Sequence, residues 1–158
     1  MITLIAAVGK NLELGKNGDL VFHIKDDMKF FRETTAGHTV VMGRKTYASF
    51  PAPLKNRENA VISHSPDLSD TRVKWFSSVE EAYNEYKDRE DEVFIIGGGV
   101  IYKEFLPLCD KMYLTEVDAE ADADTFFPAF DKNDFERTVV KTISGDGLFA
   151  TIAEYKRK

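Results

Sequence analysis

Residues 93–102 read Val-Phe-Ile-Ile-Gly-Gly-Gly-Val-Ile-Tyr, an apolar run followed by three glycines and a second apolar segment. The β-branched and aromatic residues of so short a run indicate a strand that is buried on both faces. Glycines between such a strand and a helix let a phosphate approach backbone N–H groups at the helix start. Their spacing differs from the usual dinucleotide fingerprint, so a tight turn without a ligand is an open alternative.

Further runs of β-branched or aromatic residues lie on either side of this stretch. Helical patterns separate several of them, which predicts crossover connections and a largely parallel sheet covered on both faces. Only Ser144-Gly145-Asp146-Gly147 separates the last two runs, so we expect a hairpin at an antiparallel edge. The predicted strands are Ile2–Val8, Thr39–Met42, Ala60–Ser63, Val73–Phe76, Val93–Ile96, Met112–Val117, Phe135–Ile143 and Leu148–Tyr155.

We therefore predict an α/β fold of one domain over residues 1–158, with a central eight-stranded, mostly parallel sheet, an antiparallel C-terminal hairpin edge and about four flanking helices. One helix is predicted to begin after Ser78, whose hydroxyl caps it while Glu81 reaches back as in a capping box. Its apolar stripe comprises Val79, Ala82, Tyr83 and Tyr86.

Composition excludes several classes of protein. The net charge is −6 and no long Lys/Arg block occurs, which argues against a nucleic-acid partner. No apolar run approaches the roughly 20 residues of a membrane span, and Met1–Gly9 lacks the basic start of a signal peptide. The only cysteine, Cys109, excludes an internal disulfide and favours a reducing compartment, so we expect a cytoplasmic protein. No metal-binding residues are predicted.

The helix that begins near Lys25 carries two adjacent aspartates. Its apolar stripe, at 100° per residue, is predicted to comprise Ile24, Met28, Phe31 and Thr35. Asp27 lies about 60° from the centre of this stripe, whereas Asp26 lies on the opposite side and should face solvent. An ionised carboxylate near the core is costly unless a ligand or partner bonds to it, so Asp27 is a candidate ligand-binding group. The alternative is that Asp27 only complements the positive helix N-terminus.

Further candidate residues stand at predicted strand ends, after a turn and within a strand. Met42-Gly43-Arg44-Lys45-Thr46 and Ser63-His64-Ser65 offer basic and hydroxyl groups where ligands of α/β sheets collect, which suits phosphate. Arg57, after a proline-stiffened turn, offers a guanidinium for a carboxylate. Thr115 offers a hydroxyl to a buried carboxylate. Solvated surface charge and ordinary strand packing are the alternatives for these residues. The long irregular stretch Gly9–Ile24 is predicted to be a mobile lid with hinges at Gly15 and Gly18.

In their joint order, these segments resemble bacterial dihydrofolate reductases over nearly the whole chain. The landmarks are Ile5-Ala6-Ala7, Leu14-Gly15 through Leu20, Asp27-Met28 with Phe31, Val41 through Thr46, Pro53-Leu54 with Arg57, Ile96-Gly97-Gly98-Gly99 with Tyr102, Tyr113-Leu114-Thr115 and Asp124-Thr125-Phe126-Phe127-Pro128.

This resemblance implies an enzyme that reduces 7,8-dihydrofolate to tetrahydrofolate for one-carbon metabolism. Hydride would pass from C4 of NADPH to C6 of the pterin, with protonation at N5. The resemblance makes Asp27, Leu20 and Phe22 the catalytic residues, and Asp27 would bind the exocyclic amine and a ring nitrogen of the pterin. Thr115 would support Asp27, and Arg57 would hold the α-carboxylate of the glutamate tail. The implied substrate-binding residues are Ile5, Ala6, Asp27, Met28, Phe31, Phe50, Leu54, Arg57, Ile96 and Thr115.

For NADPH, the resemblance implies that Arg44, Lys45, Thr46, Ser63 and His64 take the phosphates, including the 2′-phosphate that NADH lacks. The full implied cofactor-binding set is Ala7, Leu14, Gly15, Leu20, Gly43, Arg44, Lys45, Thr46, Ile62, Ser63, His64, Ser65, Gly97, Gly98, Gly99, Val100, Ile101, Tyr102 and Thr125. A monomer that binds dihydrofolate, NADPH and antifolate inhibitors is expected.

The sequence departs from the family pattern at several positions. Phe22 stands where the family commonly has tryptophan, so the indole N–H donor is missing. Val21 and Lys25 replace prolines, Phe50 replaces a smaller aliphatic residue, and Val100 replaces a basic one. Two alternatives stay open. A pyrimidine reductase of riboflavin synthesis would have no use for Asp27 or Arg57, and a non-catalytic NADPH sensor would need no pterin-binding carboxylate.

Overall fold

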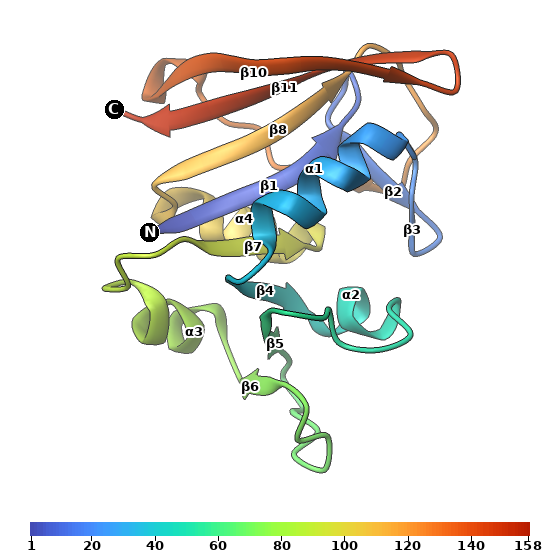
Figure 1. Ribbon diagram of the computed structural model, residues 1–158. Coiled ribbons are helices and arrows are strands. Elements are labelled where there is room, and N and C mark those ends of the chain that lie inside the picture. The colour runs from blue at the N-terminus through green and yellow to red at the C-terminus, as the bar shows by residue number, and fades with distance from the viewer.

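An eight-stranded sheet forms the centre of the computed structural model, which describes all residues Met1–Lys158 (Figure 1). The strands lie in the order β10 (Phe135–Gly145), β11 (Leu148–Arg157), β8 (Lys111–Val117), β1 (Ile2–Val8), β7 (Val93–Gly97), β4 (Thr39–Gly43), β5 (Glu58–Ile62) and β6 (Lys74–Phe76). Neighbouring strands from β8 to β6 pair in parallel. Strand β11 pairs antiparallel with both β10 and β8. The predicted α/β fold, its strands and its antiparallel C-terminal edge are confirmed.

Buried strands occupy the middle of the sheet. Val93, Phe94 and Ile95 of β7 have no exposed surface, as their continuous apolar run predicts. The C-terminal hairpin turns at Asp146 and Gly147, whose φ angles of 51° and 73° both lie in the left-handed region. Two positive φ angles are typical of the tight turns whose twist matches that of the flanking strands.

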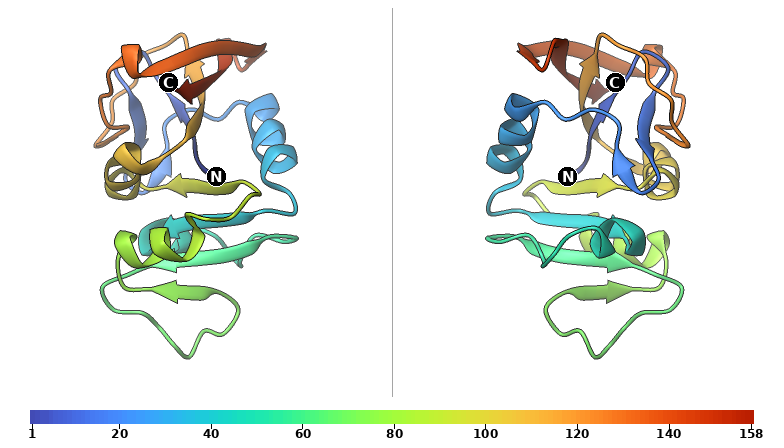
Figure 2. Two further views of the ribbon diagram at one scale, coloured as in Figure 1. Left: turned by 90° about the vertical axis from the view of Figure 1, so that its left-hand side faces the viewer. Right: turned by 90° about the vertical axis from the view of Figure 1, so that its right-hand side faces the viewer.

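Helices cover both faces of the sheet. They are α1 (Lys25–Thr35), α2 (Arg44–Ala48), α3 (Val79–Tyr86) and α4 (Gly99–Phe105), with short 3₁₀ turns at Leu106–Leu108 and Lys132–Asp134. The side views show α1 on one face and α3 and α4 on the other (Figure 2). Alternate residues of β1 therefore contribute to different cores: Leu4 lies in the cluster under α3 and α4, and Ile5 in the cluster that Phe31 of α1 covers.

The start of α3 confirms the predicted cap and corrects part of the capping box. The Ser78 hydroxyl accepts a hydrogen bond from the Glu81 N–H at 3.1 Å. The Glu81 carboxylate accepts from the Ser77 hydroxyl at 2.5 Å, not from the Ser78 backbone. In the predicted apolar stripe Val79, Ala82 and Tyr86 are buried, whereas Tyr83 is only half-buried.

Regular structure also occurs where a lid was predicted. Strands β2 (Glu13–Lys16) and β3 (Asp19–Leu20) form a hairpin, and β2 pairs with β9 (Thr125–Phe126) to complete a three-stranded sheet. A Cβ atom on Gly15 would lie 2.7 Å from the Asp19 carbonyl oxygen, so this glycine permits close packing of the two strands. Gly18 has a φ of 81° in the hairpin turn. These strands are too short and too polar to show periodicity.

None of the helices has the length and apolar character that crossing a membrane requires. Cys109 follows the first 3₁₀ turn and is buried as a free thiol.

Candidate active site

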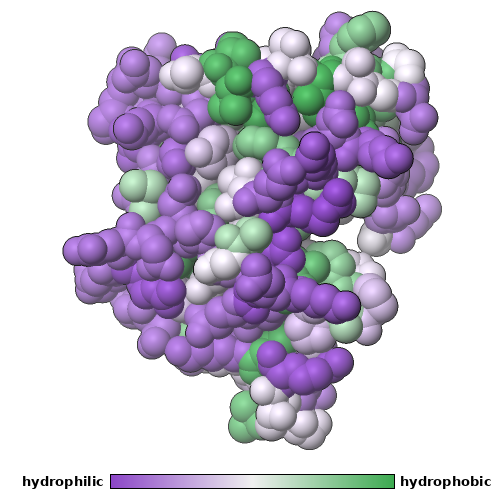
Figure 3. Space-filling model, in the orientation of Figure 1, coloured by the Kyte–Doolittle hydropathy of each residue, from purple (hydrophilic) through white to green (hydrophobic).

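Many of the predicted site residues lie at or just after the carboxyl ends of strands β1, β4, β5 and β7. The space-filling view shows the surface indented between the part that carries β2 and β3 and the part that carries α2 (Figures 1 and 3). Strands β1, β4, β5 and β7 run parallel, so their carboxyl ends meet at this edge. In open α/β sheets ligands bind at this edge.

Asp27 lies half-buried on α1 and faces β8, whereas Asp26 is exposed, as helix geometry predicts. The Thr115 hydroxyl donates a hydrogen bond to Asp27 Oδ1. Burial raises the pKa of Asp27 and the Thr115 hydrogen bond lowers it by less, so that the pKa lies above its ordinary value. The site therefore holds a carboxylate that favours a ligand able to donate hydrogen bonds to it.

Tyr102 links α4, the helix that follows the glycine turn, to strand β1. Its hydroxyl donates to the Ile5 carbonyl oxygen at 2.7 Å. Burial, and then the negative charge of Asp27, raise the pKa of Tyr102 far above its usual range, so the phenol stays protonated.

The predicted apolar face of α1 is confirmed at Ile24, Phe31 and Thr35, which are buried or partly buried, but not at Met28. Met28 is 47% exposed, so its assignment to the buried stripe was wrong. Phe30 is half-buried instead, with its ring edge-on to Tyr113 at 5.6 Å between centroids. The helix packs against β10 as well as over β1 and β8, and this second neighbour turns Phe30 inward.

Arg57 is fixed by three neighbours on the substrate side of the predicted site. Its Nε donates to Thr35 Oγ1 at 2.9 Å, and its terminal nitrogens donate to the Lys55 and Arg32 carbonyl oxygens at 3.0 and 3.2 Å. The guanidinium carbon lies 5.9 Å from the centre of the Phe31 ring. Burial, and then the nearby charge of Arg32, lower the pKa of Arg57. No carboxylate of the chain pairs with this cation.

The glycine turn after β7 packs closely against two other predicted cofactor segments. A Cβ atom on Gly97, whose φ is 141°, would lie 3.3 Å from Thr46 Oγ1, and one on Gly99 would lie 3.0 Å from Thr125 Cγ2. The Gly97–Gly98 peptide bond is cis. A Cβ atom on Gly43 would lie 3.1 Å from Ile101. Any larger residue at these positions would press on the side chains of Thr46, Thr125 or Ile101, so glycine suits this close packing.

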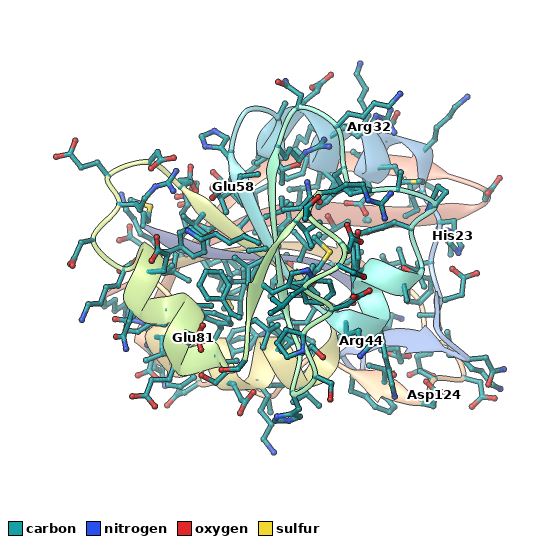
Figure 4. The ribbon with its side chains drawn as sticks, turned by 90° about the horizontal axis from the view of Figure 1, so that it is seen from below. His23, Arg32, Arg44, Glu58, Glu81 and Asp124 are labelled. Atoms are coloured by element: carbon teal, nitrogen blue, oxygen red, sulfur yellow. The ribbon has the colours of Figure 1, made fainter.

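Basic and hydroxyl groups surround this turn. Arg44 donates to the Ser65 carbonyl oxygen at 3.1 Å, and the buried Ser63 hydroxyl accepts from the Ser65 N–H at 3.1 Å. Arg44 and Lys45 are exposed and form no ion pair, although the chain carries a net charge of −6. Seen from below, Arg44 lies on the same side as Asp124, while Glu81 lies on the opposite side (Figure 4).

The other predicted residues line the same edge at different depths. Buried residues are Ile5, Leu14, Gly15, Phe22, Ile62 and Ile101. Partly buried residues are Ala6, Ala7, Phe50, Leu54, Ile96, Gly98 and Thr125. Exposed residues are Leu20, His64 and Val100, of which Val100 is 71% exposed and Leu20 53%. Phe22 packs in a small cluster with Ile24 and Ile143.

Sequence reasoning missed the buried carboxylate of Glu13, which is 1% exposed. Its oxygens accept from the Asn11 N–H at 2.6 Å and the Ala121 N–H at 2.8 Å. Asp124 makes a similar link between the same two segments, because its carboxylate accepts a hydrogen bond from the Asn17 N–H at 2.9 Å. The only signal was a charged residue between Leu12 and Leu14 in an apolar setting.

A separate depression of about 990 Å³ lies beside β8, β10 and β11. None of the predicted site residues lines it. Its walls mix Lys10 and Lys132 with Glu116 and Asp118, so its charge favours no single kind of ligand.

The mostly parallel sheet, the clustered glycines and the half-buried Asp27 carboxylate are typical of an α/β enzyme with a ligand site at the carboxyl edge of its sheet. Comparisons with known proteins specify the class. Residues 1–157 match the family model for dihydrofolate reductase. The chain belongs to the dihydrofolate reductase family, as its resemblance predicts.

Individual relatives support this assignment. Dihydrofolate reductase from Haemophilus influenzae is 40% identical over 85% of this chain and 82% of that protein. The enzyme from Neisseria meningitidis serogroup A is 38% identical over 99% of this chain and 98% of that protein. The structure of dihydrofolate reductase from Enterococcus faecalis, complexed with NADP(H) and RAB-propyl, aligns with a TM-score of 0.90 and 33% identity over 100% of this chain and 96% of that chain.

Proposed function

We propose that this enzyme reduces 7,8-dihydrofolate to 5,6,7,8-tetrahydrofolate with NADPH. The observation that carries the proposal is the half-buried Asp27 carboxylate, held by Thr115 at the edge of the sheet where the glycine turn and the unpaired basic groups meet. The similar E. faecalis protein is named as a dihydrofolate reductase and is complexed with NADP(H), which supports dihydrofolate as the substrate and NADPH as the cofactor.

The residues around the glycine turn fit NADPH. Close packing of Gly97 and Gly99 against Thr46 and Thr125 leaves backbone, not side chains, along the turn. Arg44 and Lys45 supply positive charge that no carboxylate of the chain neutralises, which suits phosphates. When bound, the dihydronicotinamide supplies the hydride. Ala7, Leu14, Leu20 and Tyr102 would shape the space for its ring.

Asp27 would select and orient the pterin. An ionised carboxylate has only acceptor oxygens, whereas the exocyclic amine and the adjacent ring nitrogen of a dihydropterin offer donors. The Thr115 hydroxyl already occupies one side of Oδ1 and fixes the carboxylate plane. Burial raises the pKa of Asp27, so its negative charge is poorly compensated before substrate binds. We assign to Asp27 the role of raising the availability of the proton that reaches N5 through water.

Arg57 would bind the other end of the substrate. Its three hydrogen bonds orient the guanidinium before the substrate arrives. A cation without a carboxylate partner is a receptor for the α-carboxylate of the glutamate tail. Phe31, Phe50 and Leu54 would pack between the two polar ends, and inhibitors that mimic the pterin would bind Asp27 in the same way. The proposal further holds that residues 1–158 act as one domain, as a monomer, in the cytoplasm.

Product analysis tests the proposal. Purified protein is mixed with dihydrofolate and either NADPH or NADH, and the products are identified by mass spectrometry. We expect tetrahydrofolate in an amount equal to the NADPH consumed, and much slower conversion with NADH. Oxidation of NADPH without tetrahydrofolate, or no reaction while NADPH still binds, would contradict the proposed reaction and favour the pyrimidine reductase or the sensor.

A further inference from the structure

Asp70 lies at the centre of a hydrogen-bonded cluster that the proposed reaction does not use. It belongs to the connection of residues 63–73 between β5 and β6. Its carboxylate accepts from Tyr47 Oη at 2.5 Å and from Arg72 Nε and NH2 at 3.0 Å each. Its backbone carbonyl accepts from Trp75 Nε1 at 2.9 Å. The side chain of Asp70 is only 14% exposed. We call Tyr47, Asp70, Arg72 and Trp75 the Asp70 cluster.

This cluster joins two segments that carry the proposed phosphate-binding residues. Helix α2 contributes Arg44, Lys45 and Thr46, and the connection contributes Ser63, His64 and Ser65. Three hydrogen bonds involve side chains of α2 and the connection: Arg44 donates to the Ser65 carbonyl oxygen, Tyr47 donates to Asp70, and Arg72 donates to Tyr47 Oη at 3.3 Å. Arg44 and Tyr47 are three residues apart, so both project from the same side of the helix.

The Tyr47 ring packs against aromatic and apolar side chains. It meets the Trp75 ring edge-on at 5.9 Å between centroids, and both rings pack against the apolar cluster that contains Met42 and Val61. The hydrogen bonds from Arg72 and then Tyr47 hold the pKa of Asp70 far below its usual range, so the carboxylate stays ionised at any working pH. The position of the 63–73 connection relative to α2 therefore depends on a charged and nearly buried group.

We propose that Asp70 is a positioning residue that, through Tyr47, sets the preference for NADPH over NADH. Without the two Tyr47 hydrogen bonds, the Arg44–Ser65 hydrogen bond is the single side-chain link from α2 to the connection. The part of the connection beyond Ser63, which follows the paired ends of β4 and β5, is then held less firmly against Arg44. The 2′-phosphate would then be held less well. NADH lacks that phosphate, so its binding should not change. This inference rests on the proposed function.

The test compares Tyr47→Phe with the parent enzyme by calorimetric titration of NADPH and of NADH, without substrate. We expect the Kd for NADPH to rise about threefold to tenfold, the factor that corresponds to one hydrogen bond. The Kd for NADH and the kcat at saturating NADPH should differ from the parent values by no more than about twofold, less than the change expected in the Kd for NADPH. Asp70→Asn should change the NADPH-to-NADH ratio in the same direction. Tyr83→Phe, a half-buried tyrosine on α3 with no side-chain hydrogen bond, is the matched control and should leave the ratio unchanged.

The possible results separate the role of Tyr47 from the proposed preference for NADPH. If Tyr47→Phe weakens both cofactors by the same factor, or neither, the proposal is overturned, whatever happens to the melting temperature. If the parent already binds NADPH and NADH equally, the proposed cofactor preference itself is wrong, and this inference falls with it.

Discussion

Arg57 illustrates how single residues of the site are prepared for their ligands. All three of its hydrogen-bond acceptors are oxygens of neighbouring residues, Thr35, Lys55 and Arg32, so the guanidinium is oriented without being neutralised. An ammonium group on a flexible chain cannot reproduce that planar arrangement of donors. The identity of this residue should therefore matter beyond its charge.

We predict that Arg57→Lys raises the KM for dihydrofolate about 10- to 100-fold, the range expected for losing a charge-assisted hydrogen bond. The KM for NADPH should not change, because Arg57 lies on the substrate side. Steady-state kinetics with each substrate varied in turn measures both constants. Arg32→Lys, at the exposed neighbour, is the control. Equal KM values for dihydrofolate in Arg57→Lys and the parent would refute the assignment.

Residue positions were predicted well where helix geometry alone decides them. The spacing on α1 places Asp27 inward and Asp26 outward, as observed. The choice between Met28 and Phe30 depends on packing against β10, which no local pattern reports. Glu13 was missed because its partner Ala121 is 108 residues away.

At the scale of elements, the β2–β3 hairpin is held against the segment that leads into β9. Glu13 accepts from Ala121 N–H, Asp124 accepts from Asn17 N–H, and Lys16 pairs with Asp122. Burial raises the pKa of Glu13, but the backbone N–H groups lower it by more, so the net pKa lies below its ordinary value. The ionised form of Glu13 therefore stabilises the fold at neutral pH.

We predict that Glu13→Gln lowers the free energy of unfolding by about 1 kcal/mol at pH 7. The NH₂ group of the glutamine would face one of the backbone N–H groups that now donate to the carboxylate, so two donors would oppose each other. A carboxyl with a lowered folded-state pKa contributes stability above its unfolded pKa and loses it as the pH falls through the folded pKa. The difference between variant and parent should therefore shrink in acid. Urea unfolding across this pH range measures it, with the exposed Glu120→Gln as control. A constant or growing difference in acid would contradict the assignment.

Element boundaries show what sequence can and cannot establish. The eight strands of the main sheet were predicted because each carries a run of β-branched or aromatic residues. The small sheet was not, because β3 and β9 contain two residues each and owe their structure to pairing with β2. Distant pairing overrides local preference in such short strands.

At the scale of the whole molecule, the sheet couples both halves of the site. Asp27 and Thr115 lie on α1 and β8, and the groups proposed to bind phosphate follow the ends of β4, β5 and β7. Ile95 lies in β7 between β1 and β4 and is fully buried. Packing at this position supports both halves.

We predict that Ile95→Ala lowers the free energy of unfolding by about 2–5 kcal/mol, the usual cost of such a cavity. Fluorescence and circular dichroism should report one coincident urea transition, as we expect of the single domain proposed for residues 1–158. Val139→Ala, at a side chain on β10 that is 51% exposed, should have little effect. Two separated transitions in the parent would contradict the single domain.

Asp27 is the residue on which the proposed reaction depends most. Its raised folded-state pKa means that the ionised carboxylate destabilises the fold as the pH rises through that pKa. Asp27→Asn should therefore be at least as stable as the parent at pH 7, and its amide oxygen can still accept from Thr115. Any loss of activity in this variant would then reflect chemistry and not unfolding.

The most direct measurement is the pH dependence of dihydrofolate reduction by the parent and by Asp27→Asn, with NADPH saturating. We predict that the variant binds NADPH normally, loses activity about 10²- to 10⁴-fold at pH 7, and recovers part of it in acid, where the substrate arrives already protonated. A variant as active as the parent at pH 7 would contradict the central claim that the Asp27 carboxylate serves the reduction of dihydrofolate.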